Sequence, residues 1–217
     1  MIVDFNILGV TTFGAMFPLE SHIENQFRSW VPEKLTNSSV IRKNDFLAGR
    51  YCAYQAAKVQ GYELKSLPSN STREPLWPLD LKGSISHSKR MAISCVSTSA
   101  DILSIGIDAE EILDMHLGSD FQDTIASSEE LILVRGLQDR RALTILFSAK
   151  EALYKALFPI TKAFIDFKEV RLLALDLDSK TFELELIQTN KKFYGTFKEI
   201  AETIITMVTI PSEKVCD

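Results

Sequence analysis

Two stretches with helical periodicity constrain the possible folds of this chain more than any other feature. Residues 38–60 place leucine and aromatic side chains at helical spacing, and Gly61 then supplies a helix stop. Residues 127–158 show a second helical pattern in two pieces, which join near residues 136–140. The sequence therefore predicts two helical regions that are widely separated along the chain.

Strand-like runs lie between and after these helices. Residues 91–97 are apolar on both faces, as in a central strand, whereas residues 103–110 alternate in polarity. The tail holds three more runs, at 170–175, 181–187 and 204–210. Because the helices are segregated from strands that look antiparallel, the order favours an α+β fold over a doubly wound sheet.

The length and composition are those of a globular protein with room for one large domain or two lobes. The chain has 217 residues, of which 46% are hydrophobic and 24% charged. These values exclude a disordered chain. The net charge of −5 lacks the basic excess of a nucleic-acid-binding protein, so no nucleic-acid partner is expected.

The three cysteines, Cys52, Cys95 and Cys216, are far apart and form no CxxC pair. A cysteine-based zinc site needs closely spaced ligand pairs, so we interpret these residues as free thiols in a reducing compartment. No stretch resembles a targeting segment or is apolar enough to span a membrane. We therefore expect a cytoplasmic protein.

Two carboxylates lie at the end of the alternating strand. Side chains alternate between the faces of a strand, so Asp108 and Glu110 point the same way, with Gly106 beside them to admit another group. Paired carboxylates suit Mg²⁺, which prefers oxygen ligands. The alternative is an ordinary strand end whose acidic side chains face water.

A second cluster lies on the helix at residues 147–158. At about 100° per residue, Ser148, Glu151 and Lys155 fall on one face, and leucines fall on the opposite face. Glu151 could then bind a metal and Lys155 a phosphate. The alternative is a surface ion pair, because Glu and Lys spaced by four residues are common on exposed helices.

A histidine and three arginines form two further clusters. His87 lies within Gly83–Ser88, where small hydroxyl residues could hydrogen-bond to a phosphate. Arg42 and Arg50 are close to two helical turns apart, and Arg73 follows in a loop. The arginines could clamp a phosphomonoester. The alternatives are a histidine without a role and a solvated basic helix face.

Taken together and in order, these clusters resemble the Sfp-like class of 4′-phosphopantetheinyl transferases, and within it the branch of the enterobactin-synthase component D enzymes. The likeness runs from about residue 38 to residue 170. The motifs that carry it are Arg42–Ala53, Arg73–Pro78, Gly83–Ser88, Ile105–Glu110 and Phe147–Ala156. One departure is Asp80, because the branch usually has a glycine there.

The resemblance implies an enzyme that transfers the 4′-phosphopantetheine arm of coenzyme A to a serine of an acyl or peptidyl carrier protein. The other product would be adenosine 3′,5′-bisphosphate, and the branch points to nonribosomal peptide synthesis of a siderophore. Carrier proteins of polyketide or fatty-acid synthesis are the alternative targets. Two rival hypotheses are a different Mg²⁺-dependent phosphoryl-transfer enzyme and a catalytically silent scaffold that binds carriers.

The resemblance also assigns roles to individual residues. The metal ligands for Mg²⁺ would be Asp108, Glu110 and Glu151. The residues that contact coenzyme A would be Arg42, Arg50, Arg73, Ser86, His87, Asp108, Lys150, Glu151 and Lys155. The catalytic residues would be Glu151, Lys155 and His87. Of these, Glu151 would activate the carrier serine, either directly or through a water at the metal.

The fold implied by the resemblance has two similar α/β lobes related by a pseudo-twofold axis, with coenzyme A in the cleft between them. Residues 1–103 would form the lobe on the 3′-phosphate and adenine side. Residues 104–217 would form the lobe with the carboxylates and the catalytic helix. A cleft completed by one chain implies a monomer. Candidates for carrier docking are the apolar residues Ile112, Leu113, Met115 and Leu117. The alternative for these residues is a core flap or a lid.

Overall fold

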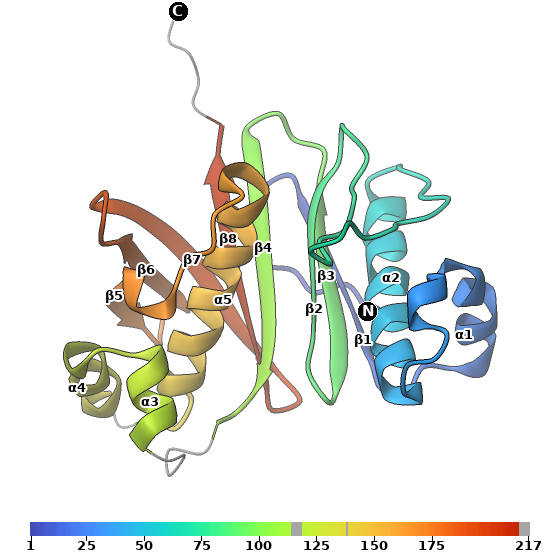
Figure 1. Cartoon of the computed structure of the whole chain (residues 1–217). Coiled ribbons are helices and arrows are strands. Elements are labelled where there is room, and N and C mark those ends of the chain that lie inside the picture. Colours follow the sequence, from blue (N-terminus) through green and yellow to red (C-terminus); the bar gives the residue numbers. More distant parts are fainter. Residues whose placement is uncertain (114–118, 138, 213–217) are drawn as a thin grey trace, which may run out of the picture. The chain divides into compact units, whose positions relative to one another are not determined.

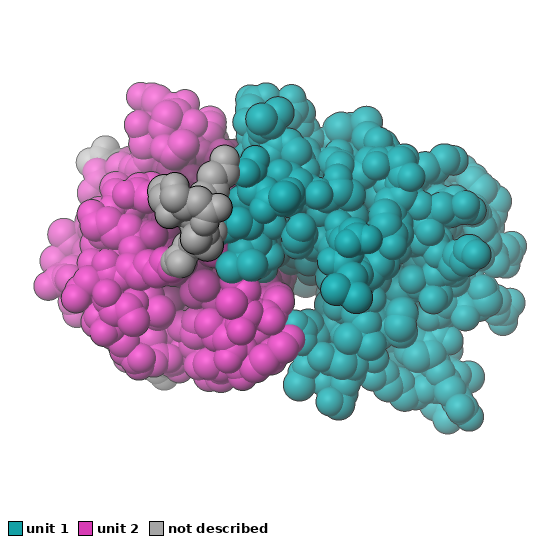
Figure 2. All heavy atoms as spheres, turned by 90° about the horizontal axis from the view of Figure 1, so that it is seen from above, with its two compact units in different colours: residues 1–105, 211–217 teal, residues 106–210 magenta. Residues whose placement is uncertain are grey.

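The computed structural model describes residues 1–113, 119–137 and 139–212 (Figure 1). Contacts divide the chain into two compact units, which Figure 2 shows in different colours. Unit 1 comprises Met1–Ile105 and the residues from Pro211 onward, and unit 2 comprises Gly106–Ile210. The sequence analysis divided the chain between residues 103 and 104, whereas the contacts divide it inside strand β4 (Ile102–Glu111).

Unit 1 is built on a three-stranded antiparallel sheet in the order β1-β3-β2. Its strands are β1 (Val10–Met16), β2 (Lys82–His87) and β3 (Met91–Ser97). Every residue of β3 is buried, which confirms the predicted central strand. The turn from β2 to β3 is tight, because the backbone N–H of Ser88 donates to the carbonyl of Met91 at 2.8 Å.

Helix α2 (Val40–Val59) confirms the first predicted helix. Ser39 caps its start by accepting a hydrogen bond from the Arg42 backbone N–H at 3.3 Å. Gly61 follows its end with a φ of 77°, the left-handed conformation that stops a helix. The helix packs small, fully buried side chains against the sheet, namely Ala48, Cys52, Ala53, Ala56 and Ala57.

The short helical elements before α2 were not predicted from the sequence. They are α1 (Ser21–Phe27), η1 (Arg28–Trp30) and η2 (Glu33–Leu35). Phe27, Trp30 and Tyr54 pack edge-to-face, with ring centroids 5.0 to 6.2 Å apart. Aromatic packing with α2, rather than helix length, therefore stabilises this segment.

Unit 2 contains most of a five-stranded sheet in the order β4-β8-β7-β6-β5. After β4 the strands are β5 (Val170–Asp176), β6 (Thr181–Leu186), β7 (Lys191–Ile200) and β8 (Thr203–Pro211). The pairs from β5 to β8 are antiparallel and follow one another along the chain. Three of these strands confirm the predicted tail strands.

The sequence analysis missed β7. Its charged ends and Gly195 are atypical of a strand, because glycine weakens strands. The structure explains the glycine: a Cβ on Gly195 would lie 2.2 Å from the Phe182 ring of β6. The residue is therefore required by a contact with another strand, which a local pattern does not reveal.

The second predicted helical region is confirmed as two helices, α4 (Ser128–Gly136) and α5 (Ala142–Thr161). Two further short elements are α3 (Ser119–Ile125) and η3 (Phe167–Glu169). Figure 1 shows α5 lying along the sheet of unit 2, and its buried face forms the core there with strand residues such as Leu184 and Val208. Each unit thus combines antiparallel strands with one 20-residue helix, which confirms the α+β class. The predicted pseudo-twofold relation between lobes stays a prediction.

Two smaller predictions concern thiols and membranes. Cys52 and Cys95 are buried free thiols, and Cys216 lies outside the described residues. Among the described residues, no helix combines the length and the apolar character that crossing a bilayer requires.

The contact between β4 and α5 depends on Gly106. A Cβ built on this residue would lie 1.9 Å from the Ala152 carbonyl oxygen and 2.6 Å from the Ala156 backbone nitrogen. Both neighbouring atoms belong to the helix backbone, so neither can rotate away. Only glycine allows β4 and α5 to approach this closely.

Substitution of Gly106 tests this contact. We expect Gly106→Ala to lower the free energy of unfolding by about 3 kcal/mol or more, because the added methyl group forces the helix away from the strand. Urea unfolding monitored by circular dichroism measures the change. The matched control is Gly136→Ala, since a Cβ at Gly136 meets nothing within 4 Å and helix propensity favours alanine. An equal, small effect of both substitutions would contradict the close contact.

Candidate functional site

Asp108 is the buried centre of the carboxylate cluster. It lies on β4 facing α5, and only 2% of the residue is exposed. Lys155 Nζ donates to its Oδ1 at 2.6 Å, and Ser148 Oγ donates to its Oδ2 at 2.8 Å. The alternative of a strand end with acids facing water is therefore wrong for Asp108.

The helix α5 presents its polar residues as the sequence predicted. Ser148 is fully buried against Asp108, while Glu151 and Lys155 are half-buried on neighbouring positions of the same face. Because Lys155 pairs with a buried carboxylate of β4, a simple surface ion pair within α5 does not account for it. The approach at Gly106 is what brings strand and helix side chains together.

The charges in this cluster are poorly compensated. Burial is the main cause that raises the pKa of Glu110 to about 7, and the negative charge of Asp108 adds to the effect. Burial likewise raises the pKa of Glu151, against the lowering influence of Lys155. The cluster therefore favours binding of an additional cation or proton.

The donor atoms of this cluster fit Mg²⁺ in kind. Carboxylate oxygens are the hard ligands that Mg²⁺ takes, together with phosphate oxygens and waters. In the described parts of the chain, however, no three His, Cys, Asp or Glu side chains are already gathered closely enough to hold a metal. Binding by Asp108, Glu110 and Glu151 would require their side chains to turn toward a common point.

Lys150 has a different environment from the one predicted. Its side chain is buried, and its Nζ donates to the carbonyls of Ile125 and Phe167 at 3.0 and 2.9 Å. It also contacts the Glu130 carboxylate at 2.8 and 3.0 Å. Burial lowers the pKa of Lys150, and Glu130 opposes that shift. All three ammonium protons are used within the protein in this conformation. The cofactor contact of Lys150 stays a prediction.

The buried Glu130 extends this network. Its oxygens accept from the backbone N–H groups of Ser127 at 2.8 Å and Leu172 at 2.7 Å. Lys150 and Glu130 therefore join the end of α3, the start of α4, helix α5, η3 and strand β5. We interpret the pair as structural.

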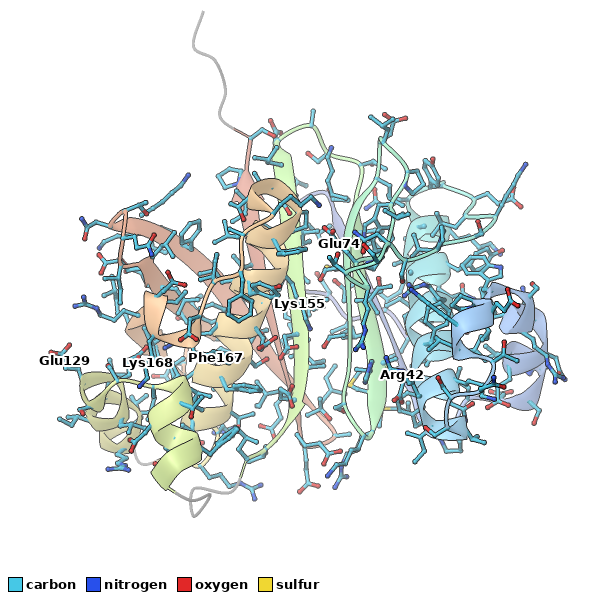
Figure 3. All side chains as sticks on the ribbon, in the orientation of Figure 1. Arg42, Glu74, Glu129, Lys155, Phe167 and Lys168 are labelled. Atoms are coloured by element: carbon cyan, nitrogen blue, oxygen red, sulfur yellow. The ribbon has the colours of Figure 1, made fainter. Side chains whose placement is uncertain are left out.

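A pocket of about 610 Å³ lies in unit 1 beside α2. The predicted basic residues Arg42, Arg50, Arg73 and His87 all line it, and Lys34 adds a further cation that the sequence analysis missed. Asp45 is the acidic residue of the lining. Figure 3 labels Arg42 on α2 and Lys155 on α5, which represent the two clusters. The positive lining suits a phosphate group.

Arg50 anchors the loop that closes this pocket. Its Nε donates to the Leu67 carbonyl at 2.7 Å, its Nη2 donates to Ser69 Oγ at 2.6 Å, and its guanidinium lies 4.2 Å from the Phe46 ring centroid. Burial lowers the pKa of Arg50 to about 10. A buried guanidinium gains from a bound anion, so Arg50 both positions the loop and favours negative charge in the pocket.

Arg73 and His87 reach the pocket through local backbone geometry. Arg73 has a φ of 68° in a turn where its N–H donates to the Asn70 carbonyl at 3.2 Å. His87 ends β2 and is exposed. Ser86 is buried on the opposite face of β2 and does not line the pocket, because neighbouring strand residues point to opposite faces. The structure therefore does not bring Ser86 and His87 together there.

Three other sequence predictions concern loops. Asp80 is absent from the residues with positive φ in the described chain, so this loop does not need the glycine that the resemblance led us to expect. Ile112 packs against the core of unit 2, and the Leu113 N–H donates to Thr144 Oγ1 at 2.8 Å. The other docking candidates, Met115 and Leu117, lie outside the described residues.

Removal of Lys150 distinguishes a structural role from cofactor binding. We expect Lys150→Met to lower the free energy of unfolding by about 3–5 kcal/mol, because it leaves the Glu130 carboxylate buried without its cation. Chemical denaturation measures this, and titration calorimetry of the folded protein measures coenzyme A affinity, which we expect to persist. Lys168→Met is the matched control at an exposed position. Unchanged stability with lost coenzyme A affinity would contradict the structural role.

Comparison with known proteins agrees with the residues described above. The model of the 4′-phosphopantetheinyl transferase N-terminal domain matches residues 31–97, and that of the 4′-phosphopantetheinyl transferase superfamily matches residues 104–208. Enterobactin synthase component D of Salmonella typhi is 36% identical over 135 residues, covering 58% of this chain and 54% of that protein. The Escherichia coli K12 protein of the same name is 37% identical over 132 residues, covering 58% and 61%.

A third relative matches over a larger share of its length. The 4′-phosphopantetheinyl transferase Npt of Nocardia iowensis is 30% identical over 159 residues, covering 69% of this chain and 71% of that protein. The component D relatives, in contrast, are matched over little more than half of their length. Two family models in succession, together with this relative, show that the chain belongs to the 4′-phosphopantetheinyl transferase superfamily.

Proposed function

We propose that this chain transfers the 4′-phosphopantetheine arm of coenzyme A to a serine of a carrier protein. The observation that carries the proposal is the close contact of β4 and α5 at Gly106. This contact puts Asp108 beside Lys155, on the helix face that also carries Glu151. A buried carboxylate held by a half-buried lysine on a helix with a second carboxylate suits the chemistry of a pyrophosphate.

In this proposal the unit 2 cluster holds the pyrophosphate of coenzyme A. Asp108, Glu110 and Glu151 would hold Mg²⁺, which when bound neutralises pyrophosphate charge and favours attack on phosphorus. Lys155 would release part of its bond with Asp108 to contact a phosphate oxygen, supplying positive charge where the leaving group develops negative charge. The remaining task of the protein is to align the serine oxygen with the bond that breaks.

The reaction is a balanced group transfer. The serine oxygen forms a bond to the phosphorus that carries the pantetheine, and the bond from that phosphorus to the bridging oxygen breaks. Adenosine 3′,5′-bisphosphate leaves with the bridging oxygen. Glu151 accepts the serine proton, because a serine hydroxyl is a weak nucleophile without a base.

The pocket in unit 1 would bind the 3′-phosphate of the same coenzyme A molecule. Arg42 and Arg73 are exposed cations in its lining, whereas Arg50 is buried and donates hydrogen bonds to Leu67 and Ser69. His87 lines the same pocket, so we assign it to phosphate binding.

The partner would reach Glu151 from the solvent-facing side of α5. That side carries Phe147, Tyr154 and Phe158, at helical spacing around Glu151. Phe147 extends the aromatic surface to Phe121 and Phe167, with ring centroids 6.1 and 5.4 Å away. Apolar rings around a carboxylate fit a carrier helix that presents a serine among apolar side chains.

The names of these relatives suggest the pathway. Proteins named enterobactin synthase component D suggest that the carrier belongs to nonribosomal peptide synthesis of a siderophore. We include in the proposal a cytoplasmic location, which rests on the free cysteines, and a monomer, which rests on the family resemblance. Carriers of polyketide or fatty-acid synthesis are the alternative targets.

Intact-protein mass spectrometry tests the proposal. We expect an apo peptidyl carrier domain, incubated with coenzyme A, Mg²⁺ and this protein, to gain the mass of one phosphopantetheine arm. EDTA should abolish the gain, and Glu151→Gln should slow it at least about 100-fold, because the base is lost. The control is Glu129→Gln, the same substitution at an exposed position of α4 (labelled in Figure 3).

Other outcomes would contradict the proposal. No mass gain on peptidyl or acyl carriers, with no binding of coenzyme A, would exclude the transferase. Coenzyme A binding together with carrier binding, but without transfer, would favour the silent scaffold. Equal activity of Glu151→Gln and Glu129→Gln would remove Glu151 from the reaction.

A further inference from the structure

A pair of buried hydroxyl groups lies behind the Asp108 carboxylate. Ser148 Oγ is 2.8 Å from Asp108 Oδ2 and 2.8 Å from Thr206 Oγ1. Thr206 Oγ1 also lies 2.8 Å from the Ser148 carbonyl oxygen. Ser148 and Thr206 have no solvent exposure, and Asp108 has 2%. The three side chains come from α5, β8 and β4, so they connect the elements that form the carboxylate cluster.

The available protons give this series of hydrogen bonds a direction. Each hydroxyl group has one proton, and an ionised carboxylate only accepts hydrogen bonds. The Ser148 proton is therefore used on Asp108 Oδ2, which leaves Ser148 Oγ as acceptor for Thr206. The Thr206 proton is shared between Ser148 Oγ and the Ser148 carbonyl. The hydrogen bonds thus run from Thr206 through Ser148 to Asp108.

Packing alone does not explain a threonine at position 206. Its neighbours on the same strand face, Ile204 and Val208, are fully buried parts of the apolar core of unit 2. Valine has nearly the shape of threonine and a higher preference for such a site. The hydroxyl of Thr206 instead hydrogen-bonds to Ser148, and Ser148 in turn hydrogen-bonds to Asp108.

Thr203 provides a contrast within the same strand. It is also fully buried, yet among the described residues its Oγ1 has no hydrogen-bond partner. Thr203 and Thr206, the two buried threonines of β8, thus share burial and chemistry but differ in their connection to Asp108. Thr203 is therefore a matched control for Thr206.

We propose that Ser148 and Thr206 are positioning residues for the transfer reaction. Ser148, supported by Thr206, donates a hydrogen bond to Asp108 Oδ2. This bond keeps Oδ1 turned toward Lys155 and toward the cation that the carboxylates would bind. The inference rests on the proposed function and deepens it. Groups that orient a metal-binding carboxylate commonly change metal affinity about 10- to 100-fold when they are removed.

Binding of Mn²⁺ to the full-length protein tests the inference without catalysis. Electron paramagnetic resonance measures the concentration of free Mn²⁺ while Mn²⁺ is titrated into the protein. We expect Thr206→Val and Ser148→Ala each to weaken binding about 10-fold. Thr206→Ser retains the hydroxyl and should restore most of the affinity. Thr203→Val should bind as the wild type does. Urea unfolding of each variant confirms that the compared proteins are folded.

A double variant tests whether the two hydroxyls act in series. If Thr206 acts only through Ser148, Ser148→Ala with Thr206→Val should bind Mn²⁺ no more weakly than Ser148→Ala alone. Independent, additive losses would overturn the series arrangement. Should Thr206→Val misfold, Ser148→Ala still decides whether the hydroxyl facing Asp108 matters for the metal.

The remaining outcomes separate this inference from the proposed function. Wild-type affinity in both Thr206→Val and Ser148→Ala, with carrier modification by the wild type intact, would overturn the positioning role alone. A wild type that binds Mn²⁺ but leaves every apo carrier unmodified would overturn the transferase and with it this inference. A wild type that binds no Mn²⁺ would overturn the inference as well.

Discussion

The approach of one glycine to a helix backbone is the constraint on which the candidate site depends. At Gly106 the strand β4 lies so close to α5 that a single Cβ would collide with the Ala152 carbonyl. The same approach lets Lys155 and Ser148 reach the two oxygens of Asp108. A bulkier residue would separate the strand carboxylates from the helix carboxylate. Packing geometry and site chemistry therefore share one cause.

Two networks of buried polar groups lie on opposite sides of α5 in unit 2. Asp108, Ser148, Thr206 and Lys155 connect the helix to β4 and β8 and leave one carboxylate oxygen turned toward Lys155. Lys150 uses its protons within the protein and connects the helix to other elements. Neighbouring residues of this helix thus join different networks, because consecutive positions face different surroundings.

Local patterns predicted the parts of this molecule that depend on local chemistry. Apolar residues at 91–97 marked the central strand, and the alternation over residues 103–110 predicted the strand that carries Asp108. The arginines eight residues apart on α2 do line one pocket. The features that were not predicted depend on contacts between residues distant in sequence. They are strand β7 with Gly195 against Phe182, the position of Lys34 in the pocket lining, and the partners of Lys150.

The central claim is our proposal that the carboxylates of unit 2 hold a cation at the pyrophosphate of coenzyme A. Phosphorus NMR of bound coenzyme A during addition of Mn²⁺ tests it most directly, because the paramagnetic ion broadens nearby phosphorus resonances steeply with proximity. The account predicts strong broadening of both pyrophosphate resonances and much weaker broadening of the 3′-phosphate resonance. Equal broadening of all three, or strongest broadening of the 3′-phosphate, would contradict it.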